Sequence, residues 1–315
     1  MTLFQSSPIP ERGVDVVDAL QSLLGDPLFV VFALVTQLGD PWFYFVVLTG
    51  LYLVADDVAP LDRRRAAFLV ALALGVVALT STLKGYFGLP RPPVPEVVPG
   101  IEVVPPALHP LYLSVATADG FAFPSGHALG TAAIWGGVAL VLRVSTLPRR
   151  LLAAALVAGL VALSRLVLGV HYLVDVLAGA VVGAAFLAVV YLLAERGERP
   201  KRAFALAVAL AVVSVVTRGL TFETAAALGA TTGGMVAWHY ADDHVVGRRL
   251  TRREWAIGAT MLGTLGVGFA VLYTYLPSPA VAFVGGVLVV VGVLMTPLLA
   301  DEADEPDGRE ANVGV

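Results

Sequence analysis

Cysteine is absent from this chain of 315 residues. Its absence excludes disulfide bonds and thiolate metal sites, and it leaves the redox compartment open. Charge is scarce as well, at 14% of the residues, whereas 58% are hydrophobic and the mean hydropathy is +0.85. The alternating ten-residue segments of a membrane β-barrel are also missing. What remains is a chain dominated by long apolar runs.

These runs approach the length of ~20 residues that a helix needs to cross the hydrocarbon core of a bilayer. We therefore predict an all-α, polytopic helical membrane protein. A short apolar helix at 28–38 should be broken from the first span by Gly39-Asp40-Pro41, and residues 14–24 should form a helix in the membrane interface. Residues 1–25 lack the apolar core of a cleavable signal peptide. The expected spans are 41–55, 66–87, 125–142, 151–167, 174–194, 203–216, 225–238, 255–275 and 280–299.

The basic residues divide unequally between the two sides of this topology. Loops on one side carry 15 of the 20 Lys and Arg residues, and the positive-inside rule makes that side cytoplasmic. The other side holds the remaining five, which are Arg12, Lys84, Arg91, Arg165 and Arg218. We expect this second side, with the N-terminus, to face away from the cytoplasm.

Three polar stretches interrupt the apolar sequence at the ends of the expected spans. They are Lys84-Gly-Tyr-Phe-Gly-Leu-Pro-Arg91-Pro92, then Pro124-Ser125-Gly126-His127, then Ser164-Arg165 with His171 and Asp175. Ionisable residues near a bilayer are costly and usually functional. Since the topology brings all three stretches to the non-cytoplasmic side, they predict a single polar pocket.

The residue types in this pocket suit catalysis on an anion. His171 and Asp175 are four residues apart and share a helix face, so the carboxylate can accept Nδ1–H and leave Nε2 as a nucleophile or base. Ser125 can cap a helix whose first amides, with Gly126, face an anion, and His127 in that turn can donate a proton. Each feature alone is also compatible with an ordinary helix cap.

Lys84, Arg91 and Arg165 add three positive charges, which suit the charge of a phosphate monoester. A single one of them would be compatible with a side chain that reaches out to lipid headgroups. A metal is not expected, because two His and one Asp make a thin ligand set and three cations would repel a divalent ion. We predict a phosphate site without metal.

The three stretches follow the patterns KxxxxxxRP, PSGH and SRxxxxxHxxxD. In this respect, and over roughly residues 14–194, the chain resembles the phosphatidic acid phosphatase type 2 superfamily, the lipid phosphate phosphatases. The resemblance implies a helical core that hydrolyses phosphate esters without metal or cofactor. One departure is Ala122, where many relatives carry Ser.

The resemblance also implies a role for each matching residue. His171 would attack phosphorus and form a phosphohistidine, Asp175 would orient it, and His127 would protonate the leaving group. The phosphate would be held by Lys84, Arg91, Ser125, Gly126 and Arg165.

On this basis we divide the chain into four segments. Residues 1–27 form an N-terminal interfacial segment, 28–195 the lipid phosphatase core, 196–300 an additional transmembrane region of unknown role, and 301–315 a disordered acidic tail. The Pro-rich loop 92–123 should be a stiff lid. The cluster of His239, Asp242, Asp243 and His244 suggests an interfacial loop anchored by Trp238 more than it suggests a metal site.

The expected substrate is a lipid phosphate or diphosphate, with phosphatidic acid, phosphatidylglycerophosphate and polyprenyl diphosphate as candidates. The expected surroundings are the lipids of the cell membrane, with the active site on its non-cytoplasmic face, no nucleic acid as partner, and the oligomeric state left open. Two alternatives remain: a vanadate-dependent haloperoxidase, which holds vanadate with the same residue types, and a non-enzymatic transporter or scaffold.

Overall fold

The computed structural model describes residues 12–56, 61–247 and 250–302, and over these ranges the chain is helical without strands. The predicted acidic tail lies almost wholly outside the described residues. The helices are α1 (Val14–Leu23), α2 (Asp26–Val35), η1 (Thr36–Gly39), α3 (Pro41–Val54), α4 (Arg63–Phe87), η2 (Ile101–Val103), η3 (Pro106–Leu108), α5 (His109–Ala116), α6 (Gly126–Val141), α7 (Leu147–Val167), α8 (Leu173–Leu193), α9 (Pro200–Arg218), α10 (Phe222–Val245), α11 (Arg252–Tyr275) and α12 (Pro279–Glu302).

Each predicted span corresponds to a helix, and the prediction of an all-α polytopic membrane protein is confirmed. Within the described ranges, six helices are long and apolar enough to cross a membrane: α4, α7, α8, α9, α11 and α12. The segments 26–39 and 41–54, bent by 49°, make a seventh candidate if they form one broken span. The expected break at Asp40 is present, and its side chain caps α3 by accepting a hydrogen bond from the Trp42 amide at 3.2 Å.

Besides α3, which qualifies only together with the preceding bent segment, two of the nine predicted spans are not long and apolar enough to cross a membrane. α6 is apolar but has only 16 residues. α10 has 24 residues, but its Thr and Gly residues and its polar last turns reduce its hydropathy. Both helices pack inside the bundle, where contact with neighbouring helices replaces contact with lipid.

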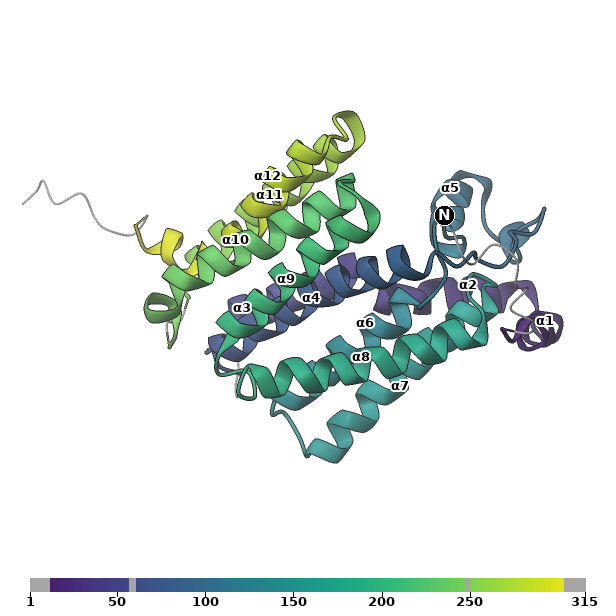
Figure 1. Ribbon diagram of the computed structural model, residues 1–315, viewed down its shortest axis with the longest axis horizontal. Helices are drawn as coiled ribbons and strands as arrows, with labels where there is room; N and C mark the ends of the chain where they lie inside the picture. Colours follow the sequence, from purple (N-terminus) through teal and green to yellow (C-terminus); the bar gives the residue numbers. More distant parts are fainter. Residues whose placement is uncertain (1–11, 57–60, 248–249, 303–315) are drawn as a thin grey trace, which may run out of the picture.

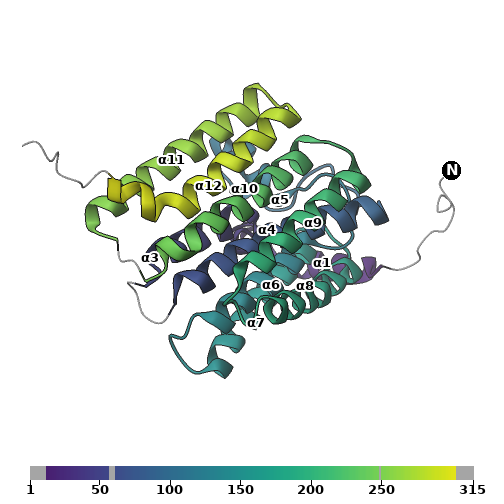
Figure 2. The same cartoon turned by 60° about the vertical axis from the view of Figure 1, so that its left-hand side comes forward.

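The long helices run roughly side by side (Figures 1 and 2), and α1, α2 and α5 lie at one end of the bundle (Figure 1). One cluster of buried side chains extends through α3, α4, α6, α8, α9, α10 and α12, and includes the fully buried Phe68, Phe204 and Leu294. The helices after residue 199 are therefore part of the same core as those before it.

The segment around Trp238 corrects one prediction. We expected an interfacial loop, but these residues continue helix α10, and Trp238 is fully buried with its ring 6.4 Å from that of Tyr52. The helix tolerates its polar last turns because Asp242 pairs with Arg64 at 2.8 Å and with Lys201 at 3.6 Å. The other three residues of the cluster, His239, Asp243 and His244, are exposed. Among the described residues, no group of three or more His, Asp or Glu side chains is arranged to hold a metal.

Two glycines allow α8 to lie very close to α6. A Cβ atom at Gly179 would come within 2.5 Å of the Ser125 carbonyl oxygen, and one at Gly183 within 2.3 Å of the Leu129 carbonyl oxygen. Both obstacles are backbone atoms of α6, which cannot rotate away as a side chain can. The close approach brings the beginning of α8 beside the beginning of α6, where the predicted catalytic residues lie.

We predict that Gly183→Ala destabilises the protein by about 1–3 kcal/mol, because the added methyl group overpacks the α6–α8 contact. The matched control is Gly159→Ala, where an added Cβ meets no atom within 4 Å. Since alanine favours helix over glycine by up to about 1 kcal/mol, the control should be neutral or stabilising. Thermal unfolding of both variants in detergent measures the difference. Equal unfolding temperatures for the two variants would contradict this account of the α6–α8 contact.

Candidate active site

The three motif stretches meet at the end of the bundle where α1, α2 and α5 also lie. Lys84 is in the last turn of α4 and Arg91 follows that helix, whereas Arg165 is in the last turn of α7. His127 occupies the first turn of α6, and His171 lies in the short connection between α7 and α8. The structure thus brings the predicted site residues together from four segments.

His171 is buried, with its side chain only 1% exposed. Its Nε2 lies 3.1 Å from Arg91 Nη1, and its Nδ1 lies 3.5 Å from Asp175 Oδ2. A guanidinium can only donate, so this contact makes Nε2 the acceptor and leaves the ring proton on Nδ1, toward the carboxylate. The Nε2 lone pair is therefore directed into the group of cations. The distance of 3.5 Å between Nδ1 and Oδ2 is longer than an N–H···O hydrogen bond. The two groups therefore face each other without forming a hydrogen bond.

The pKa of His171 is well below its ordinary value. Burial is the main cause, followed by the positive charges of Arg165, Arg91, Lys84 and Arg12. Both effects disfavour an imidazolium ion. The ring is therefore neutral, as a nucleophile requires.

Asp175 joins several parts of the site and is fully buried. Its Oδ2 accepts a hydrogen bond from the Tyr172 amide at 3.0 Å, and its Oδ1 pairs with the guanidinium of Arg12. Its backbone carbonyl accepts from the Ser125 amide at 2.9 Å, which ties the first turn of α8 to the first turn of α6. Sequence reasoning missed Arg12 as a site residue. In the sequence, the only indication of such a role was that Arg12 lies on the same side of the membrane as the cations of the motifs.

The first turn of α6 presents the expected anion-binding features. Ser125 is fully buried, and its Oγ accepts a long hydrogen bond of 3.5 Å from the Ala128 amide. The first amides of a helix have no acceptor within the helix, so those of Gly126 and His127 are available to an anion. A Cβ atom at Gly126 would lie 2.9 Å from Thr80 Cγ2, so the close packing against α4 favours glycine.

His127 has an acidic neighbour that sequence reasoning did not assign to the site. Its Nε2 lies 3.8 Å from Asp40 Oδ2, and its ring lies against Gly39 at the break between η1 and α3. The predicted break is thus the segment that places a carboxylate beside the second candidate catalytic histidine.

Positive charge gathers around the two histidines. Arg165 is 3% exposed and donates from Nη1 to Thr36 Oγ1 at 2.8 Å, whereas Arg91 donates to the carbonyl oxygens of Asp119 at 2.9 Å and Val170 at 2.8 Å. Lys84 is close enough for its charge to interact with those of Arg91 and Arg165. Cations held this close together, with few neighbouring carboxylates, favour a multiply charged anion between them.

A further cation comes from a helix beyond the motifs. Arg218, at the end of α9, crosses Gly85 of α4 and places Nη1 3.4 Å from Ser81 Oγ. A Cβ atom at Gly85 would be only 2.4 Å from Arg218 Cγ, so glycine makes room for this side chain. Its charge also interacts with that of Lys84. We had counted Arg218 on this side of the membrane but had given it no role.

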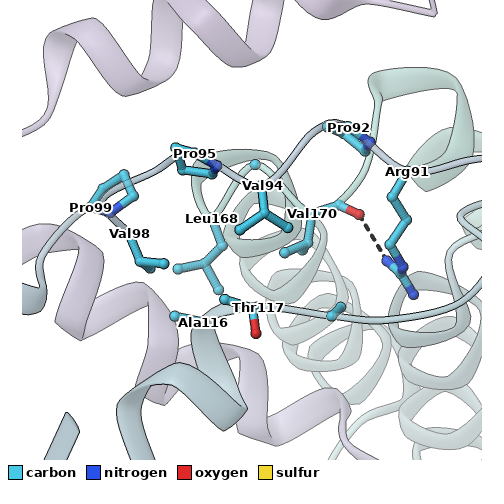
Figure 3. A pocket seen from close by; sticks show the side chains of 12 residues that line it. Arg91, Pro92, Val94, Pro95, Val98, Pro99, Ala116, Thr117, Leu168 and Val170 are labelled. Carbon is cyan, nitrogen blue, oxygen red and sulfur yellow. Dashed lines mark hydrogen bonds between the residues drawn. The ribbon is translucent and has the colours of Figure 1, made fainter. Parts of the chain in front are cut away.

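The Pro-rich segment after Arg91 is folded over this end of the bundle. It contains η2, η3 and α5, and the Gly100 amide donates to Asp26 Oδ1 of α2 at 3.1 Å. A small pocket, partly open to solvent, lies beneath residues 92–99 with Arg91 at one end (Figure 3). Its walls are apolar and include Val98, Leu168 and Val170, so it offers an uncharged surface beside the cations. The two histidines are not among its lining residues.

Residues 65–199, less than half of the chain, match the family model of the PAP2 superfamily. Over this segment the chain is similar to the PAP2 superfamily. The segment contains all eight predicted site residues, whereas Arg12, Asp40 and the whole of α9 to α12 lie outside it. This similarity supports a phosphoester hydrolase. No curated protein and no solved structure matches the chain.

The depressed pKa of His171 predicts how stability depends on pH. Below about pH 6.5 the unfolded chain binds a proton at this residue that the folded protein does not bind, so acidification destabilises the fold by at most about 1.4 kcal/mol per pH unit. His171→Asn removes this contribution and should lose less stability between pH 7.5 and 5.5. The measurement is the unfolding temperature in detergent at both pH values.

His244→Asn is the control, because it removes an exposed histidine from the opposite end of the bundle. A decrease as steep in His171→Asn as in the native protein would show that His171 is protonated in the fold.

Proposed function

We propose that this protein is an integral-membrane, metal-independent phosphatase that hydrolyses a lipid phosphate or diphosphate through a phosphohistidine. The observation that carries the proposal is the position of His171. Its Nε2 faces the cations, 3.1 Å from Arg91 Nη1, while Nδ1 faces Asp175. A nucleophile aimed at a bound anion makes use of both contacts.

In the first step, the Nε2 lone pair attacks phosphorus and an N–P bond forms. The bond from phosphorus to the lipid oxygen breaks, and that oxygen takes a proton from His127. Arg91, Arg165 and Lys84, with the first amides of α6, stabilise the charge on the equatorial oxygens. The positive charge that develops on His171 lies beside Asp175, which is its counter-ion.

In the second step, a water molecule attacks phosphorus from the side that the leaving group has vacated. His127, now neutral, accepts the proton of this water. The N–P bond breaks, its electron pair returns to Nε2, and inorganic phosphate leaves. Each histidine is then back in its starting form, so neither a metal nor an organic cofactor is required.

A lipid substrate suits the location of this site at one end of a bundle of apolar helices, beside the apolar pocket under residues 92–99. The excess of basic residues at the opposite end supports a site that faces away from the cytoplasm. Phosphatidic acid, phosphatidylglycerophosphate and a polyprenyl diphosphate are the substrates to compare.

We expect the purified full chain to release phosphate from at least one of these lipids with EDTA present, and vanadate to inhibit the release. His171→Ala should reduce release to background, because it removes the nitrogen that is proposed to form the N–P bond. His127→Ala should lower kcat by about 10²–10⁴-fold, the range for loss of a general acid. Substrate labelled in the phosphate should leave an acid-labile label on the native protein and none on His171→Ala.

His239→Ala, an exposed histidine at the opposite end of the bundle, is the matched control and should keep native activity. Full activity of His171→Ala would contradict the proposal. Peroxide-dependent halide oxidation in the presence of vanadate, with no phosphate release, would favour a haloperoxidase. No activity of either kind in folded protein would favour a transporter or scaffold.

A further inference from the structure

The carboxylate of Asp175 has a partner that no motif position supplies. Arg12 pairs its Nη2 with Asp175 Oδ1, and the two side chains are 8% and 0% exposed. Arg12 lies more than fifty residues before the segment that matches the PAP2 superfamily. A buried pair of this kind therefore links the N-terminal segment to the candidate catalytic residues.

Other contacts hold Arg12 in place from several sides. Its Nη1 donates to the Pro90 carbonyl oxygen at 2.9 Å, next to Arg91. Its guanidinium carbon lies 4.5 Å from the centre of the Tyr172 ring, and its own carbonyl oxygen accepts from the Val174 amide at 3.3 Å. The guanidinium is thus fixed by the same two segments that carry Arg91 and His171.

Helix α1 docks the N-terminal segment on the protein rather than only on the membrane surface. Gly13 has φ +87° and lies so close to α8 that a Cβ atom there would be 2.7 Å from Leu173 Cβ. Val17 is buried in a cluster with Leu166, and Gln21 Nε2 donates to the Val167 carbonyl oxygen at 3.1 Å. The position of Arg12 is therefore set by a folded element.

The two oxygens of Asp175 are divided between two tasks. Oδ1 pairs with Arg12, which leaves Oδ2 to accept the Tyr172 amide at 3.0 Å and to face His171 Nδ1 at 3.5 Å. A buried carboxylate stays ionised only if a cation or hydrogen bonds compensate its lost hydration. Arg91 and Lys84 also interact with its charge, but a bound phosphate would engage them. Arg12 would then be the cation that remains paired with Asp175.

We propose that Arg12 is a positioning residue for the reaction. It holds the Asp175 carboxylate turned so that Oδ2 faces Nδ1 of His171 throughout both steps, and it does not touch the phosphate. This inference rests on the proposed phosphatase function.

Steady-state kinetics of the full chain test the inference with Arg12→Gln, Arg12→Lys, Asp175→Asn and the Arg12→Gln/Asp175→Asn double variant. Arg12→Gln should lower kcat about 10–100-fold, the range seen when a partner that orients a metal-bound histidine is lost, with KM little changed. Arg12→Lys keeps the charge and should recover part of kcat. The double variant should be no less active than Asp175→Asn, because Arg12 acts through that carboxylate.

Gln21→Ala is the control for docking of α1, since it removes the hydrogen bond to Val167 and leaves Arg12 in place. It should keep near-native kcat. A native kcat in Arg12→Gln, or losses that multiply in the double variant, would overturn the inference. If Arg12→Gln alone does not fold, the double variant can still be used, because it buries no unpaired charge. Its kcat is then compared with that of Asp175→Asn. Absence of phosphate release by the native protein would instead refute the proposed function.

Discussion

The rest of this site depends on one buried negative charge. The carboxylate of Asp175 is fully buried, and it is compensated by a guanidinium from the N-terminal segment and by the Tyr172 amide. Burial of an uncompensated carboxylate would be prohibitive, so its partners have to be in place for the fold to form. Because the same residue also accepts the Ser125 amide, α6 and α8 are fixed relative to each other at the point where the two candidate catalytic histidines meet.

Most of the helices could be predicted from the sequence, because apolar runs and their breaks are local features. The three motif stretches could also be assigned to one site. The unequal distribution of Lys and Arg between the loops fixes the topology, and that topology places the span ends that carry the motifs on one side of the membrane. Arg12 and Asp40 could not be found in this way. Their roles depend on how α1 docks on α8 and how the broken helix turns toward His127. Neither tertiary contact can be derived from the spacing of residues along the sequence. Trp238 was misplaced for a similar reason, since its burial depends on packing against Tyr52 of α3.

The helices beyond the matched segment contribute to the core and to the rim of the site. Phe204, Trp238 and Leu294 are fully buried in the cluster that also contains Phe68 of α4. Thr82 of α4 donates to the Leu210 carbonyl oxygen of α9 at 3.3 Å, and Arg218 continues this contact toward Ser81. The additional region is therefore structurally inseparable from the helix that carries Lys84, and the charge at the site extends beyond the family's own motifs.

The shared core also constrains the order of assembly during synthesis. Chains emerge from the ribosome with the N-terminal residues first, so α3 and α4 are made well before the helices that cover them. Tyr52 of α3 donates to the Leu294 carbonyl oxygen of α12 at 2.7 Å, near the end of the described chain. One face of α3 and one of α4 must therefore stay exposed to lipid, or to a membrane chaperone, until the last helices are inserted. The packing around α3 and α4, which are synthesised first, is therefore completed only when α12 has been inserted.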